Sequence, residues 1–129
     1  MSMEVALLCL SLNVYHEARS EPVVAQQAVA YVTLNRTRQD HDLCDVVLRR
    51  GQFSWTRTSM LNGVLREGMA PDRSSTAWRQ AVNVALTTAT GSDFTGGATH
   101  FHHIGVSPEW ANKMTYTGTW GTHRFYREK

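Results

Sequence analysis

The sequence lacks any long hydrophobic run. No stretch approaches the roughly 18 consecutive apolar residues that a membrane-spanning helix needs, and the longest apolar run, Val5 to Leu12, leads directly into a polar cluster, Asn13 to Glu21. This run also has no basic leader and no small-residue cleavage site, which favours a core helix over a signal peptide. We therefore expect a protein that does not insert into membranes and that is made in a cytoplasm, with no export signal visible.

Charge and cysteine are also scarce. Charged residues make up 19% of the chain and the net charge is only +2, which is too weak to indicate nucleic-acid binding but suits approach to an anionic cell envelope. The two cysteines, Cys9 and Cys44, both lie in apolar surroundings. We interpret them as two reduced core thiols, and a disulfide remains an open alternative.

Repeats, low-complexity tracts and linkers are absent too, and 129 residues suit one domain, 1–129. Apolar spacing and capping residues predict four helices, a short strand and a single turn. In chain order these are Glu4–Arg19, Pro22–Arg38, Asp42–Arg50 and Ser75–Thr90 for the helices, Thr99–His103 for the strand and Pro108–Ala111 for the turn. The predicted fold class is α+β, mainly helical.

Two of these helices have a predicted buried face. In the second helix, which Pro22 is expected to open as first residue, the face consists of small and β-branched residues. In the helix over 75–90 the apolar residues of the buried face recur at three- and four-residue spacing. The two faces are Ala25, Ala28, Val29 and Val32, and Trp78, Ala81, Val82, Ala85, Leu86 and Ala89.

The first candidate for chemistry is Glu17, in the last turn of the first predicted helix. A carboxyl beside the end of an apolar element can be desolvated, which would raise its pKa and suit it to donate a proton to a glycosidic oxygen. The alternative is a solvated helix end in which glutamate and arginine pair locally.

Glu21 lies four residues after Glu17, a spacing that on a continuous helix would bring two carboxyls within the range of a retaining glycosidase pair. Pro22 breaks this spacing because it disfavours helical geometry at the residue before it. We therefore expect one working carboxyl, Glu17. Glu21 is assigned a supporting role, in which it caps or braces the second helix or orients Arg19.

A second candidate is the histidine cluster His100-Phe101-His102-His103. On a strand, His100 and His102 would share a face, and His123 or Glu17 could complete a zinc site. The chain has no His-Glu-x-x-His motif and no cysteine pair at ligand spacing. The cluster is therefore assigned to the polar wall of a cleft, with no metal and no cofactor.

Aromatic and amide side chains form a third candidate group, because the apolar faces of sugar rings pack on aromatics while their hydroxyls bind amides and carboxylates. Trp55, beside Ser54 in a predicted turn, and Trp110 are the aromatics most expected to be exposed in a cleft. The predicted substrate-binding residues are Gln52, Phe53, Ser54, Trp55, His100, Phe101, His102, Trp110 and His123.

Taken together, these segments resemble the catalytic domain of SleB-type cell-wall hydrolases, which include spore cortex-lytic enzymes and phage endolysins. The likeness rests on several pieces in the same order along nearly the whole chain. They are Val14–Glu21; Gln26, Ala28–Ala30 and Leu34–Arg36; Cys44–Val47; Gln52–Trp55; Gly97–Phe101; Pro108–Trp110; and Gly121–Arg127. Ser20 and Ala25 depart from it, since glycine is usual at both positions.

The resemblance implies a lysozyme-like fold, a cleft for alternating N-acetylglucosamine and N-acetylmuramic acid, and Glu17 as catalytic acid/base. The expected function is a lytic transglycosylase that forms 1,6-anhydro-N-acetylmuramic acid, as a monomeric phage endolysin stored in the host cytoplasm and acting on the cell wall. The alternatives are a hydrolytic muramidase, a metal-dependent amidase that uses the histidine cluster, and a non-catalytic glycan-binding module.

Overall fold

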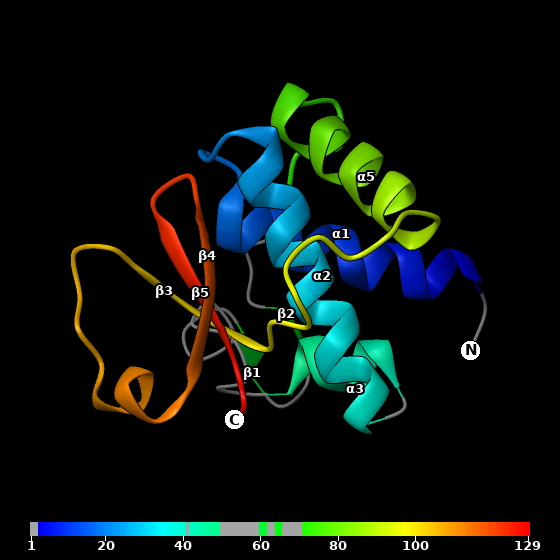
Figure 1. Cartoon of the computed structure of the whole chain (residues 1–129). Helices are drawn as coiled ribbons and strands as arrows, with labels where there is room; N and C mark the ends of the chain where they lie inside the picture. The colour runs from blue at the N-terminus through cyan, green and yellow to red at the C-terminus, as the bar shows by residue number, and fades with distance from the viewer. Residues whose placement is uncertain (1–2, 41, 50–59, 62–63, 66–70) are drawn as a thin grey trace.

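The computed structural model describes residues 3–40, 42–49, 60–61, 64–65 and 71–129. A group of helices lies on one side and a three-stranded antiparallel sheet on the other (Figure 1). The helices are α1 (Met3–Ala18), α2 (Val23–Asp40), α3 (Leu43–Leu48) and α5 (Thr76–Ala89). The predicted mainly helical α+β class is therefore confirmed. Among the described helices, none combines the length and apolar character needed to cross a bilayer.

The helix ends follow the capping residues in the sequence. The side chain of Asp42 accepts a hydrogen bond from the Asp45 amide (2.9 Å), and that of Ser75 accepts one from the Trp78 amide (3.1 Å). The carbonyl of Pro22 accepts the first hydrogen bonds of α2, so Pro22 immediately precedes the helix and is not its first residue as predicted. The predicted stop of the third helix at Gly51 lies outside the described residues.

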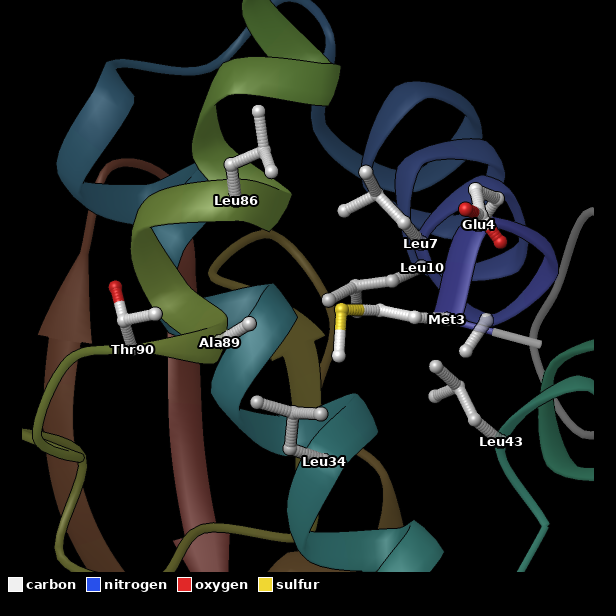
Figure 2. A pocket seen from close by; sticks show the side chains of 10 residues that line it. Met3, Glu4, Leu7, Leu10, Leu34, Leu43, Leu86, Ala89 and Thr90 are labelled. Carbon is white, nitrogen blue, oxygen red and sulfur yellow. The ribbon is translucent and has the colours of Figure 1, made fainter.

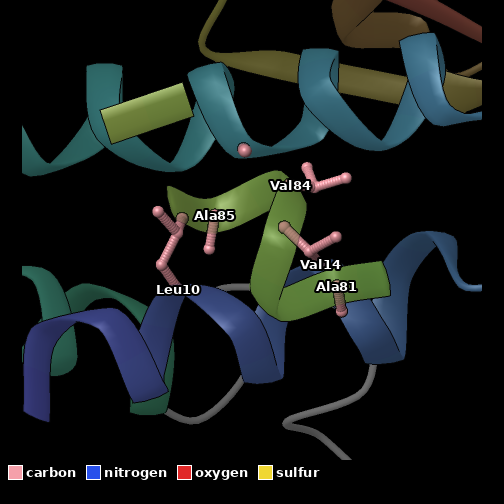
Figure 3. Packing of buried hydrophobic residues seen from close by; sticks show 6 residues of the cluster. Leu10, Val14, Ala81, Val84 and Ala85 are labelled. Atoms are coloured by element: carbon pink, nitrogen blue, oxygen red, sulfur yellow. The ribbon is translucent and has the colours of Figure 1, made fainter. Parts of the chain in front are cut away.

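α2 is central because both of its faces are covered. On the helical side Ala30 packs with Leu10 and Val14 of α1 and with α5. Figure 3 shows Leu10 and Val14 of this cluster beside Ala81, Val84 and Ala85 of α5. On the other side Ala28, Val29 and Val32, all predicted core residues, pack against the sheet residue Phe125. Removing each large apolar side chain from water stabilises the fold by about 1.5–3 kcal/mol, so this two-sided packing holds the two layers together.

The buried face of α5 differs from the predicted one. Trp78, Ala81 and Ala85 are buried as expected, but Leu86 is 50% exposed and Ala89 is exposed, while Val84 and Thr88 are buried. Leu86 and Ala89 line an apolar cavity of about 410 Å³ between α1, α2, α3 and α5 (Figure 2). The apolar spacing therefore predicted the helix but misplaced its buried face by part of a turn.

The sheet is built from β3 (His100–His103), β5 (His123–Arg127) and β4 (Thr115–Trp120), with β5 in the centre. The 3-10 helix η1 (Glu109–Lys113) joins β3 to β4 and includes the predicted turn around Trp110. Only β3 was predicted as a strand. A second sheet pairs β1 (Met60–Leu61) antiparallel with β2 (Val64–Leu65).

Glu21 links the junction between α1 and α2 to the β4–β5 hairpin through a set of hydrogen bonds, the Glu21 clasp. Its Oε1 accepts hydrogen bonds from the Thr122 amide (2.7 Å) and hydroxyl (2.8 Å) and from Nδ1 of His123 (3.2 Å). Burial works to raise the pKa of Glu21, but these hydrogen bonds and His123 outweigh it and hold the pKa below its ordinary value. The carboxylate is therefore ionised at neutral pH and ties together segments about 100 residues apart.

Gly121 makes this clasp sterically feasible. It adopts φ 60°, and a Cβ at this position would lie 2.5 Å from Oε1 of Glu21 and 2.9 Å from Cβ of Ala25. Only a residue without a side chain allows the hairpin turn to approach the α1–α2 junction so closely.

The cysteines form a disulfide, so the interpretation as two reduced thiols is wrong. Cys9 in α1 and Cys44 in α3 are bonded, with a Cα–Cα distance of 5.3 Å, and both are buried. Val46 and Val47 pack around the bond. The apolar surroundings that suggested inert thiols are those of a buried crosslink between two helices.

The disulfide should contribute measurably to stability. It closes a loop with a sequence separation of 35 residues, for which chain entropy predicts about 4 kcal/mol. We expect a reducing agent to lower the midpoint of urea unfolding of the wild type. The Cys9→Ala/Cys44→Ala variant should unfold at a lower urea concentration and should not respond to the reductant. An equal midpoint for oxidised and reduced wild type would contradict this.

Replacing Gly121 should destabilise the protein more than replacing another left-handed glycine. Gly97 has φ 81° but open space around the position of a Cβ, so Gly97→Ala should cost only the backbone conformation, about 1–2 kcal/mol. Gly121→Ala adds the clash with Glu21 and Ala25 and should cost at least about 1 kcal/mol more. Chemical denaturation of both variants measures the difference, and equal losses would show that the close approach has no energetic role.

Candidate active site

Glu17 occupies the last turn of α1, where the sequence placed it, and its side chain is half-buried. The next residue, Ala18, is 1% exposed and packs with Val29, Ala98 and Phe125. The carboxyl is therefore attached to backbone anchored in the core between α2 and the sheet, while part of its surface reaches solvent. This is the partly dry setting that a proton donor requires.

Arg36 supplies a positive charge near Glu17. It lies on α2, and its Nε donates a hydrogen bond to the Thr99 carbonyl (2.6 Å), immediately before β3. Burial lowers the pKa of Arg36 to about 10, and the charge of Glu17 acts in the opposite direction. Arg36 therefore stays positively charged at neutral pH and attracts the ionised form of Glu17.

His16 precedes Glu17 but brings no charge to it at neutral pH. Burial, and then the charge of Arg19, lower the pKa of His16 to about 4. Arg19 itself is exposed, and its guanidinium lies 4.8 Å from the centre of the Tyr15 ring. Of the alternative roles predicted for Glu21, orienting Arg19 is not seen, since the Glu21 carboxylate is bound to Thr122 and His123.

Phe101 and His123 lie together on the inner face of the sheet, toward the helices. Their ring centres are 5.3 Å apart, and Phe101 stacks on Phe125 at 5.4 Å. Burial lowers the pKa of His123 against the opposing influence of Glu21. With the ring neutral at neutral pH, a hydrogen bond from Nδ1 to the carboxylate leaves Nε2 as an acceptor.

His100, His102 and Trp110 lie on the opposite, outer face. Trp110 contacts both histidines, with ring centres 5.3 Å from His100 and 5.6 Å from His102. Nε2 of His102 is 2.9 Å from the Tyr126 hydroxyl, and the two rings stack. The predicted cleft-wall residues are therefore divided between two faces of one sheet, as strand alternation requires.

The alternative zinc site, in which His123 or Glu17 would join His100 and His102, does not form in the described part of the chain. His100 and His102 face Trp110, whereas His123 faces Phe101 and Glu21. Among the described residues, no group of three or more His, Cys, Asp or Glu side chains is placed to hold a metal ion.

Four predicted substrate-binding residues, Gln52, Phe53, Ser54 and Trp55, lie outside the described residues. Three residues that the structure makes prominent, Arg36, Thr122 and Tyr126, were not singled out in the sequence. Each lies in a segment that carries the family resemblance, Leu34–Arg36 or Gly121–Arg127. No local pattern marks Arg36, which lies in the polar last third of α2, Asn35–Asp40.

Comparison with known proteins identifies a family for this chain. The family model described as cell wall hydrolase matches residues 20–126, a range that begins just after Glu17. No curated protein sequence matches the chain.

Two solved structures share the fold. The catalytic domain of the Bacillus cereus SleB protein superposes with a TM-score of 0.76 at 21% identity, covering 98% of this chain and 93% of that one. The catalytic domain of the germination-specific lytic transglycosylase SleB from Bacillus anthracis gives a TM-score of 0.73 at 22% identity, covering 98% and 97%. With its family match over most of its length and this fold, the chain belongs to the SleB-type cell wall hydrolase family.

Proposed function

We propose that this cell wall hydrolase is a lytic transglycosylase that cleaves the bond between N-acetylmuramic acid and N-acetylglucosamine, with Glu17 as its catalytic residue. The observation that carries the proposal is the state of Glu21, the acidic residue nearest to Glu17 in the sequence. Its Oε1 already accepts three hydrogen bonds from the β4–β5 hairpin. Glu21 is therefore a brace and not the second carboxylate of a glycosidase pair.

The chemistry then depends on one carboxyl used twice. Protonated Glu17 donates its proton to the bridging oxygen, the bond to C1 of the muramic residue breaks, and an oxocarbenium-like state develops. The ionised Glu17 next removes the proton from the 6-hydroxyl of the muramic residue. At the same time the 6-oxygen bonds to C1 of that residue. The product is a 1,6-anhydro sugar, no water is consumed, and Glu17 is again protonated.

Arg36 supports the second half of this cycle. After the first proton transfer Glu17 is negatively charged, and the partly buried, positively charged Arg36 stabilises that form until the second proton arrives. The hydrogen bond from Arg36 to the Thr99 carbonyl holds the guanidinium at the start of β3. The substrate-binding roles of Phe101 and His123 on the inner face, and of Gln52 to Trp55, remain predictions.

Glu17→Gln tests the site. The amide has nearly the same shape but cannot deliver a proton, so release of soluble fragments from purified sacculi should fall by about 10²–10⁴-fold with no change in thermal unfolding. Glu4→Gln, which removes an exposed carboxylate from the same helix, is the matched control and should retain wild-type turnover. A Glu17→Gln variant that digests sacculi at the wild-type rate would show that the acid lies elsewhere.

We further propose that the enzyme is a phage endolysin that accumulates in the host cytoplasm and works on the wall from the periplasmic side. The buried Cys9–Cys44 disulfide supports an oxidising site of action.

This role predicts that a bacterium expressing the chain lyses only when its inner membrane is opened. Turbidity should fall after a membrane-permeabilising agent is added, and expression of Glu17→Gln followed by the same agent should not reproduce the fall. Lysis by the wild type while the inner membrane is intact would contradict the proposed role.

A further inference from the structure

The outer face of the sheet carries a polar and aromatic surface away from Glu17, formed by Tyr116, Thr119, Arg124 and Tyr126. These four residues line a concave surface of about 380 Å³, in the size range of small-ligand sites. They belong to β4 and β5, whereas Glu17 is attached at the helical side of the same sheet. We propose that this outer surface binds a saccharide unit that carries a carboxylate, namely the peptide-substituted muramic acid of peptidoglycan. This inference rests on the proposed function.

An irregularity in β4 creates the surface. The register pairs Tyr116 with Tyr126 and Thr119 with Arg124, and it shifts between Tyr116 and Gly118. Residues three apart on a regular strand point to opposite faces, but the extra residue at this bulge turns Tyr116 and Thr119 to the same face. The bulge therefore places one aromatic ring, one hydroxyl and one guanidinium side by side.

The base of the surface is rigid. Tyr126 is 8% exposed, stacks on His102 and receives Trp110 edge-on at 5.4 Å. The Tyr116 ring meets Tyr126 at 5.8 Å, and its hydroxyl is 2.6 Å from Oγ1 of Thr119. Tyr116 is nevertheless 55% exposed. An exposed aromatic side chain held in one orientation by its neighbours can receive the apolar face of a sugar ring at low conformational cost.

Arg124 gives the surface its charge preference. Its side chain is exposed, and within the described part of the chain no carboxylate forms an ion pair with it. Guanidinium groups bind carboxylates through two parallel hydrogen bonds. A sugar ring on Tyr116 with a carboxylate reaching Arg124 is a combination that peptidoglycan offers on every second sugar, through the stem peptide, or through the lactyl group where that peptide has been removed.

The test uses the Glu17→Gln protein, which can bind sacculi without digesting them. Adding Tyr116→Ala or Arg124→Gln should each weaken co-sedimentation with purified sacculi by roughly fivefold, and the Arg124→Gln protein should also bind with a weaker dependence on salt. Tyr116→Phe, which keeps the ring, should bind like the parent. Arg79→Gln, an exposed arginine on α5, removes the same charge from the helical side and should have no effect.

Two substrates identify the carboxylate. If the Arg124→Gln defect disappears on glycan strands stripped of their peptides, the stem peptide supplies the carboxylate. If the defect persists, Arg124 also accepts the free lactyl carboxylate that removal of the peptide exposes.

Full binding by both Tyr116→Ala and Arg124→Gln, with unchanged thermal unfolding, would overturn the inference, as would a Glu17→Gln parent that does not bind sacculi. Failure of the proposed function is a separate result. It would be seen as absence of cleavage by the wild type, whereas the inference is tested by binding of the Glu17→Gln protein.

Discussion

The hydrogen bonds of the Glu21 carboxylate are the interaction on which the rest of this structure depends. Three donors from the β4–β5 hairpin converge on one oxygen at the junction of α1 and α2. This clasp fixes the sheet against the end of α1, the helix that carries Glu17. It requires an acidic side chain that remains ionised, a hairpin turn without a side chain at Gly121, and a hydroxyl at Thr122. The catalytic proposal also depends on it, because a carboxylate committed to the hairpin leaves Glu17 as the working acid.

The same sheet separates two chemical environments. Its inner face, with Phe101, His123 and Phe125, packs against the helices and contributes to the core. Its outer face combines His102, Trp110 and Tyr126 with the exposed Tyr116 and Arg124. A strand with alternating side chains can therefore contribute to the catalytic domain's core on one face and present a binding surface on the other. A small enzyme that acts on an extended polymer can in this way use both faces of one sheet.

Much of the fold followed from local sequence rules. Asp42, Ser75 and Pro22 placed helix starts to within a residue, and Ala28, Val29 and Val32 marked the buried face of α2. The strands β4 and β5 were not predicted, and in β4 the bulge after Tyr116 and the glycine at 118 interrupt the two-residue alternation. The disulfide was left open because apolar neighbours suit both a free thiol and a crosslink, and only the approach of α3 to α1 distinguishes them.

The candidate site, like the fold, could be predicted from the sequence only in part. Glu17 at the end of the first helix could be placed from sequence, and the family resemblance gave it a role. The partner of Glu21 could not, since Thr122 lies about 100 residues away and local spacing carries no information about it. The histidines of β3 were assigned to one wall, although alternation along the strand places His103 on the opposite face from His100 and His102. Arg36 was missed because its environment is created by the packing of α2 against β3.

The central claim is that one carboxyl acts first as acid and then as base, so that no water enters the product. Digestion of purified sacculi in ¹⁸O-labelled water, followed by mass spectrometry of the released muropeptides, tests it most directly. The account predicts 1,6-anhydro-N-acetylmuramic ends with no ¹⁸O incorporated at C1. Reducing ends that are heavier by one water and carry the label would contradict it and identify a hydrolytic muramidase.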